Sequence, residues 1–203
     1  MTKAHIRLAT PADLPRIYEI CLLTAGAGGD GTHLYSDPKG PGYMHAAPYA
    51  VLEPECAFVL DDGTGRAVGY IVGTPDTAAF EDRLDAEWWP DVRAAIAEMP
   101  VACDKDAVLI ERAKGGHRRD PSLLASYPAH LHINILPPAQ GGGWGRRMIQ
   151  TQLDAMRARG VTGLHLGLDP RNVTAIAFYT HLGFRDVSVD SDLVYGMDLR
   201  TPA

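Results

Sequence analysis

The segment from Ala129 to Gly160 constrains the fold of this chain more than any other. Polar and apolar residues alternate over 129–136, which predicts a half-buried strand. Pro137 and Pro138 end that strand, because proline cannot donate to a strand ladder. The loop Gln-Gly-Gly-Gly-Trp-Gly follows at 140–145, and apolar residues at helical spacing then predict a helix that Gly160 ends. The order strand, glycine loop, helix is typical of an α/β fold.

The rest of the chain fits the same class. Apolar periodicity predicts strands near 5–8, 56–60, 67–73, 163–167, 184–189 and 192–199, and helices over 14–21 and 172–181. Residues 78–97 are predicted to form one or two helices, with Pro90 as a break or kink. No repeat, low-complexity tract or linker interrupts the order, so we predict a mixed α/β sheet in a single domain over residues 1–203.

Two segments are candidates for the substrate side of this domain. Apolar periodicity fails from 26 to 48, and a connection this long is usually functional or mobile. We therefore predict a substrate-side insertion at about 24–50, with Asp30, His33 and Tyr35 in a substrate cleft, and a helical segment at about 78–98 beside it. The alternative for the insertion is a surface excursion whose aromatic residues are tucked inward.

Charge limits the classes of ligand. The chain has 203 residues and a net charge of −6, which disfavours a nucleic-acid partner. The charge is uneven, because residues 81–100 carry six carboxylates against two arginines and residues 141–172 carry five arginines against two aspartates. One basic segment on an acidic protein suits a small polyanion held locally. The acidic residues of 81–98 and Asp30 suggest a cationic amine, although a solvated acidic face explains them equally well.

Cysteine usage and hydropathy point to the cytoplasm. The three cysteines lie far apart without a CxxC spacing, so we expect buried thiols and neither a disulfide framework nor a metal site. No run of about 18 apolar residues is present, so no membrane partner is expected. The residues after Met1 lack the apolar core of a signal peptide.

The glycine loop favours a phosphate-bearing ligand, since its amides and the helix dipole both attract anions. It is not a Walker loop, because Gly145 is followed by two arginines, and it lacks the third glycine of the dinucleotide fingerprint. The pattern Gln-x-x-Gly-x-Gly, filled by Gln140, Gly143 and Gly145, resembles the acetyl-coenzyme A loop of GNAT-type N-acetyltransferases. The segment from Asn172 to Phe184 is similar to that family's Asn-…-Ala-…-Phe-Tyr-x-x-Leu-Gly-Phe segment, and residues 6–13 are typical of its opening.

A narrower similarity concerns residues 21–24, 88–90 and 127–133. They resemble bacterial acetyltransferases related to the C-terminal acetyltransferase-like domain of O-GlcNAcase, which is widely regarded as a pseudo-acetyltransferase. The family resemblance implies a mostly antiparallel central sheet flanked by helices and acetyl-CoA as acetyl donor, with no metal. It also implies a set of coenzyme-binding residues: Ile133, Ile135, Leu136, Gln140, Gly141, Gly142, Gly143, Trp144, Gly145, Arg146, Asn172 and Phe178. Asn172 has a competing role as a helix cap.

The resemblance and the residues together suggest the catalytic groups. Tyr179 matches the family tyrosine near the coenzyme sulfur and is a candidate general acid. His130 and His132 share one face of the predicted strand with Asn134, so the histidines are candidate bases and Asn134 a candidate acceptor contact. Histidines that bond neighbouring strands and loops are the equal alternative. A His-x-His metal site is weaker, since no third ligand is evident.

The expected function is transfer of acetyl from acetyl-CoA to a primary amine of a small molecule or peptide. No cysteine lies in a recognisable nucleophile motif, so direct transfer in a ternary complex is expected. The alternative is a catalytically inactive acyl-CoA-binding module. The expected assembly is a monomer or a homodimer.

Overall fold

One seven-stranded sheet runs through the molecule in the computed structural model, which describes residues 3–189 and 192–200. Its strands are β1 (His5–Leu8), β2 (Ala57–Asp61), β3 (Ala67–Thr74), β4 (Ala129–Ile135), β5 (Gly163–Leu168), β6 (Arg185–Asp186) and β7 (Leu193–Asp198). They lie in the order β1-β2-β3-β4-β5-β7-β6. Every neighbouring pair is antiparallel except β4 and β5, which confirms the predicted mixed, mostly antiparallel sheet.

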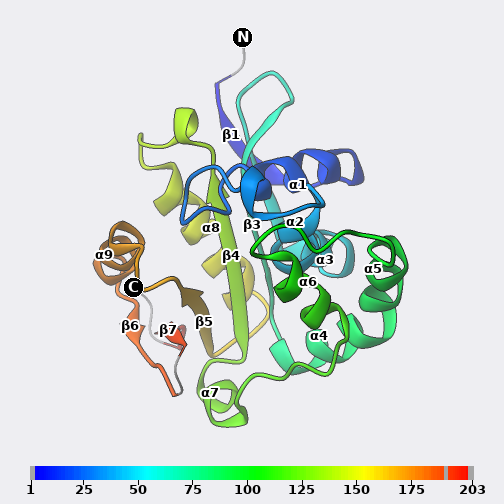
Figure 1. The fold of residues 1–203 in the computed structure, drawn as a ribbon. Helices are drawn as coiled ribbons and strands as arrows, with labels where there is room; N and C mark the ends of the chain where they lie inside the picture. Colours follow the sequence, from blue (N-terminus) through cyan, green and yellow to red (C-terminus); the bar gives the residue numbers. More distant parts are fainter. Residues whose placement is uncertain (1–2, 190–191, 201–203) are drawn as a thin grey trace.

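Helices cover both faces of this sheet (Figure 1). They are α1 (Leu14–Leu22), α2 (Gly40–His45), α3 (Ala47–Leu52), α4 (Thr77–Arg83), α5 (Trp89–Ala95), α6 (Asp106–Ala113), α7 (Pro121–Ser126), α8 (Trp144–Arg157) and α9 (Val173–His181). One apolar core joins α8 and α9 to the sheet around Leu131 and Met148. A second core joins α1, α3 and α4 to the opposite face around Tyr70. The alternating apolar and polar residues of β4 therefore face different layers.

The parallel pair in the middle of the sheet separates along its length. β4 pairs with β5 only at Ala129 with Leu164 and His130 with His165. On its other side β4 stays paired with β3 as far as Ile135. From residue 131 onward β4 therefore has an edge without a strand partner, and the two halves of the sheet diverge there.

Several predicted elements differ from those observed. The 24–50 segment contains α2 and α3, and its Tyr35 and Tyr43 pack with α5 and α6 in a third apolar cluster, so the aromatic residues are tucked inward. Residues 78–97 contain two helices, as the sequence allowed, but the junction is a π-helical turn, Leu84–Trp88, and Pro90 stands in the first turn of α5 and does not break a helix. The strand near 184–189 has only two residues, and α7 was not predicted.

No helix among the described residues is long and apolar enough to cross a membrane. The predicted domain limits, residues 1 and 203, lie outside the described part of the chain.

Candidate functional site

The glycine loop between β4 and α8 has a backbone that only glycine adopts readily. Gly141, Gly142 and Gly143 have φ values of +84°, +58° and +77°, all in the left-handed region. None of their amides donates a hydrogen bond to another described residue, and the same holds for the amides of Gly145 and Arg146 in the first turn of α8. Unpaired amides at the start of a 14-residue helix form a site for an anion. Gln140 fixes the loop, since its Nε2 donates to the carbonyl of Ile135 over 2.9 Å.

A cavity of about 570 Å³ opens beside this loop. Its walls come from the loop, the edge of β4, α9 and the start of the insertion: Ala27, Gly28, Ile133, Ile135, Gln140, Gly141, Gly143, Trp144, Gly145, Arg146, Asn172, Thr174, Ala175, Phe178 and Tyr179. Ten of the twelve predicted coenzyme residues thus lie around one cavity. Leu136 and Gly142 do not; they line a separate cavity of about 410 Å³ on the other side of the loop.

The unpaired edge of β4 forms one wall of the same cavity. The amide of Leu136 donates to the carbonyl of Val68 on β3, so alternate residues of β4 direct their backbone groups to β3. The amide and carbonyl of Ile133 are therefore directed to the β5 side, where β4 has no pairing beyond His130. This edge offers a donor and an acceptor to an extended amide-bearing chain.

Asn172 and Tyr179 reach the cavity from α9. The Asn172 Oδ1 accepts a hydrogen bond from the amide of Ala175 at 3.0 Å, so Asn172 caps α9. The same residue also lines the cavity. Tyr179 is 7% exposed, and its ring packs against Phe178 and Phe184. Its hydroxyl makes no hydrogen bond to another described residue. Burial raises the pKa of Tyr179, so the phenol keeps its proton at neutral pH.

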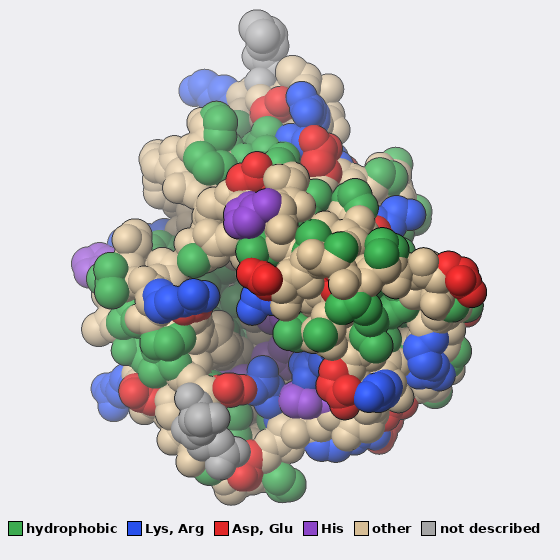
Figure 2. All heavy atoms as spheres, in the orientation of Figure 1, with side chains coloured by type: hydrophobic (Ala, Val, Ile, Leu, Met, Phe, Trp, Pro, Cys, Tyr) green, Lys and Arg blue, Asp and Glu red, His purple; other side chains and the backbone are tan. Residues whose placement is uncertain are grey.

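A second cavity, of about 590 Å³, lies across β4 from the first. Its walls come from α1, the insertion, β3, β4, the loop before α6 and the β5–β7 side: Cys21, Ala25, Tyr35, Pro41, His45, Tyr70, Lys105, Arg119, His132, Asn134, Gly167, Leu168, Pro170, Asp192 and Leu193. We call this cavity the acceptor cleft. Figure 2 shows it as a hollow on this face, with basic and histidine side chains gathered at its lower end.

The structure brings some of the predicted acceptor residues to this cleft and leaves others outside it. Tyr35 and Asn134 line it, and the Asn134 side chain is held by a hydrogen bond from its Nδ2 to the hydroxyl of Thr24. Asp30 and His33 are exposed and line neither cavity. The Asp30 carboxylate accepts from the amide and hydroxyl of Thr32, which is a local turn.

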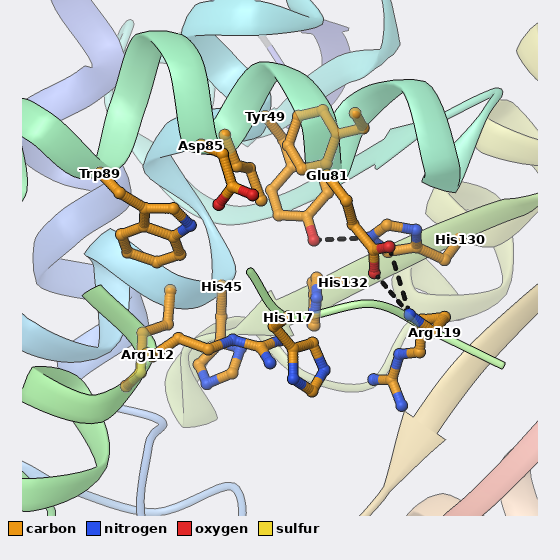
Figure 3. Close-up of a pocket in the computed structure, with 13 residues that line it drawn as sticks. His45, Tyr49, Glu81, Asp85, Trp89, Arg112, His117, Arg119, His130 and His132 are labelled. Carbon is orange, nitrogen blue, oxygen red and sulfur yellow. Dashed lines mark hydrogen bonds between the residues drawn. The ribbon is translucent and has the colours of Figure 1, made fainter. Parts of the chain in front are cut away.

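A chamber of about 70 Å³ continues the acceptor cleft inward, and His45, Arg119 and His132 line both (Figure 3). His130 is fixed in its wall. The Thr77 hydroxyl donates to the carbonyl of Pro128 at 2.6 Å, so it accepts from His130 Nδ1 at 2.7 Å. His130 Nε2 then accepts from the Tyr49 hydroxyl at 2.6 Å. Both ring nitrogens are engaged, which favours a positioning role for His130.

His132 is the free member of the predicted pair. It makes no hydrogen bond to another described residue, and its ring lies 5.2 Å from that of His45 and 5.3 Å from that of Tyr49. Burial, and then the charge of nearby groups including Arg119, lower the pKa of His132 well below its usual range. A neutral imidazole thus faces both the chamber and the acceptor cleft.

Buried neutral histidines predict a loss of stability in mild acid. Burial lowers the pKa of His45 and of His165 to about 4, against about 6.5 in an unfolded chain. Unfolded chains bind more protons below pH 6.5, so this contribution is complete above that pH and falls as the pH drops towards 4. Each of the two should cost about 1.4 kcal/mol of unfolding free energy by pH 5.5. Urea denaturation at pH 7.5, 6.5 and 5.5 measures it, and equal midpoints would contradict it.

Carboxylates whose pKa is lowered by an arginine act at lower pH, whereas burial raises the pKa of Glu53 and Glu81, so those two groups offset part of the loss. Hydrogen bonds from Arg7 lower the pKa of Asp13 to about 2, so its contribution is lost only below about pH 4.

Three cationic residues of the cleft were not predicted: Lys105, Arg112 and Arg119. Arg112 lines the chamber, Lys105 the acceptor cleft and Arg119 both. The only sequence signal was the basic run 114–119, which reads as a solvated loop. Among the described residues no group of three or more His, Cys, Asp or Glu side chains is placed to hold a metal ion.

Comparison with known proteins agrees with this geometry. Residues 30–184 match the model of the acetyltransferase (GNAT) family. A mycothiol acetyltransferase of Beutenbergia cavernae is 40% identical over 65 residues, which is 32% of this chain and 21% of that protein. Protein O-GlcNAcase of Rattus norvegicus is 22% identical over 186 residues, 90% of this chain and 20% of that protein. The chain thus spans about a fifth of the length of these relatives.

Solved structures extend the similarity to the whole fold. The crystal structure of SsHAT has a TM-score of 0.86 and 38% sequence identity, over 98% of this chain and 100% of that one. A GNAT family acetyltransferase from Brucella melitensis, in complex with acetyl-CoA, has a TM-score of 0.52 and 17% identity, over 100% of this chain and 91% of that one. The glycine loop, the diverging strands and the family match over residues 30–184 together show that the chain belongs to the acetyltransferase (GNAT) family of acyltransferases.

Proposed function

We propose that the chain transfers the acetyl group of acetyl-CoA to a primary amine, directly and within a ternary complex. One observation carries the proposal: β4 separates a cavity suited to the coenzyme from a cleft suited to an acceptor, at the point where β5 leaves it. Two reactants bound on either side of this edge would meet without a covalent enzyme intermediate. Holding them together would lower the barrier by replacing a chance encounter with a fixed geometry.

The residues of the first cavity fit acetyl-CoA. The unpaired amides of the loop and the charge of Arg146 suit a pyrophosphate, and the free edge of β4 at Ile133 suits the amides of a pantetheine arm. When bound, acetyl-CoA supplies a thioester, whose carbonyl becomes an oxyanion during transfer. A backbone amide at the β4 edge would stabilise that charge.

The acceptor side would favour a neutral amine. A primary amine with a pKa near 10.4 is mostly protonated at neutral pH, so it must lose a proton before it attacks. The cations of the cleft and the chamber, Lys105, Arg112 and Arg119, would lower the pKa of a bound ammonium. His132, neutral and without a hydrogen bond to another described residue, would take up the released proton directly or through a water.

A covalent route through cysteine is disfavoured. Cys21 lines the acceptor cleft, but burial raises the pKa of its thiol to about 11, so it is not a thiolate at neutral pH. In the direct transfer, Tyr179, which lines the first cavity, would protonate the departing coenzyme thiolate.

Replacing His132 by glutamine is expected to lower kcat/KM for the amine by about 10²–10⁴-fold, the usual effect of a lost general base. The affinity for acetyl-CoA should stay the same, because His132 does not line the coenzyme cavity. His181→Gln, at the exposed end of α9, is the matched control. A pH–rate profile checks the role, because the ionisation of His132 should disappear from the acid limb in His132→Gln while that of the amine remains. An unchanged profile would assign the base to another group.

A panel of amines and peptides, followed by release of free coenzyme thiol, tests the function. Acetyl-CoA-dependent release that requires an amine supports the proposal. Tight coenzyme binding without turnover on any acceptor would favour the inactive acyl-CoA-binding module instead.

A further inference from the structure

Two arginines at the inner chamber make no side-chain hydrogen bond. Arg112, on α6, and Arg119, before α7, are among the residues that line the chamber, and neither guanidinium group donates a hydrogen bond to another described residue (Figure 3). Arg119 has one long ion pair, 3.6 Å to Asp192. Nearby arginines differ: Arg118 pairs with Asp82 at 2.9 Å and Asp85 at 2.8 Å, and Arg93 donates to the carbonyl of Ala113. The two arginines without a hydrogen-bonded carboxylate or carbonyl are thus residues of the chamber wall.

Apart from the 3.6 Å contact with Asp192, the carboxylates nearby form no ion pair with these two guanidinium groups. Asp85 accepts from Arg118 and from the amide of Gly116. Glu81, which is 7% exposed, accepts from the backbone amide of Arg119 at 3.1 and 3.2 Å and forms no ion pair with either guanidinium. Burial and the charge of Arg119 lower the pKa of Arg112, so holding the two cations together is costly. A bound anion would remove that cost.

The rest of the wall adds no competing charge. The side chains of His45 and His132 are held neutral, mainly by burial and further by the arginines, so they act as hydrogen-bonding groups. In the adjoining acceptor cleft Lys105 and Arg119 carry positive charge and Asp192 carries one negative charge. The net positive charge there would favour an acceptor that carries a negative group.

We infer that the acceptor is a small primary amine with a carboxylate or phosphate at its other end. The anion would lie in the inner chamber on Arg112 and Arg119, whose planar donors match either group. The amine would lie in the acceptor cleft beside His132. A chamber of about 70 Å³ holds one such anionic group, and the cleft of about 590 Å³ holds the rest of the molecule. This inference rests on the proposed acetyl transfer, because only that reaction requires the amine end of the molecule to lie beside His132.

Calorimetry with the coenzyme A-saturated protein tests it with matched pairs of amines. The pairs are 4-aminobutanoate with 4-aminobutanamide, for a carboxylate, and 2-aminoethyl phosphate with 2-aminoethanol, for a phosphate. In at least one pair the anionic member should bind about tenfold tighter or better at low ionic strength. Added salt should reduce the preference.

Substitutions of the two arginines test whether they cause the preference for the anionic amine. Arg112→Gln and Arg119→Gln should each lose most of the preference while keeping wild-type coenzyme affinity, since neither residue lines the coenzyme cavity. Lys114→Gln is the matched control, because it removes one exposed charge from the end of α6 outside both cavities. Equal binding within both pairs, or a preference that survives both arginine variants, overturns the inference. A binding preference without turnover would support the anion site and count against the proposed acetyl transfer.

Discussion

Replacing Gly143 by aspartate is expected to raise the dissociation constant for acetyl-CoA at least about 100-fold while the fold survives. The side chain has room, because no atom lies within 4 Å of a Cβ at this position. Left-handed backbone, φ +77°, costs a non-glycine residue about 1–2 kcal/mol. The larger effect is electrostatic: a carboxylate would stand among the amides proposed to hold the pyrophosphate. Repulsion of about 4 kcal/mol between charges about 4 Å apart near a protein surface corresponds to roughly 10³ in affinity.

Gly160→Asp separates the loss of the site from backbone strain. Gly160 has a φ of +74° and equally open surroundings, but it lies after the opposite end of α8. This variant should lose a similar amount of stability and keep coenzyme affinity. Calorimetry with acetyl-CoA on both folded variants measures the difference. If Gly143→Asp bound acetyl-CoA like the wild type, the glycine loop would not be the coenzyme site.

The residues that line the cavity proposed for the coenzyme could be predicted to lie together because their constraints are local. Three successive left-handed residues require glycine, and a strand that has an apolar core on one face and polar side chains on the other alternates its residues. Both patterns can be read from residues 129–145 of the sequence. The exceptions, Leu136 and Gly142, lie on the far side of the loop, and the sequence carries no signal for which side of a loop a residue faces.

The insertion was not predictable in the same way. α2 and α3 are six residues long, too short for helical periodicity to stand out. Packing stabilises them instead, as Tyr43 and Met44 of α2 join Trp89 and Leu109 in one apolar cluster. Such contacts between distant segments leave no local pattern. Asp30, a polar residue in the same loop, was predicted for the cleft and only closes a turn.

The charged residues of the inner chamber could not be predicted from the sequence for the same reason. His45, Glu81, Arg112 and His132 come from four elements far apart in the chain, and only the fold brings them together. An arginine at the end of a helix is usually solvated, so Arg112 carried no signal on its own. Arg112 becomes a candidate anion-binding residue only because its guanidinium group has no hydrogen-bond partner among the described residues, and only the structure shows that.

Replacing Tyr179 by phenylalanine is expected to lower kcat by about 10²–10⁴-fold with little change in affinity for acetyl-CoA. The ring and its packing against Phe178 and Phe184 remain, and only the proton donor is lost. A general acid acts mainly in the transition state, so the loss should appear in kcat. Stability should not fall, because the hydroxyl has no hydrogen-bond partner among the described residues.

Tyr195→Phe is the matched control, since Tyr195 contacts the same apolar core from β7 and lines neither cavity. Steady-state kinetics, calorimetry with acetyl-CoA and thermal unfolding of both variants separate the possible roles. Lower stability together with weaker coenzyme binding in Tyr179→Phe would mean that the hydroxyl supports the fold. Turnover like that of the wild type would mean that water or another group protonates the thiolate. A kcat defect alone, with the control unaffected, follows only if Tyr179 donates its proton during transfer, because packing is the same in both forms of the ring.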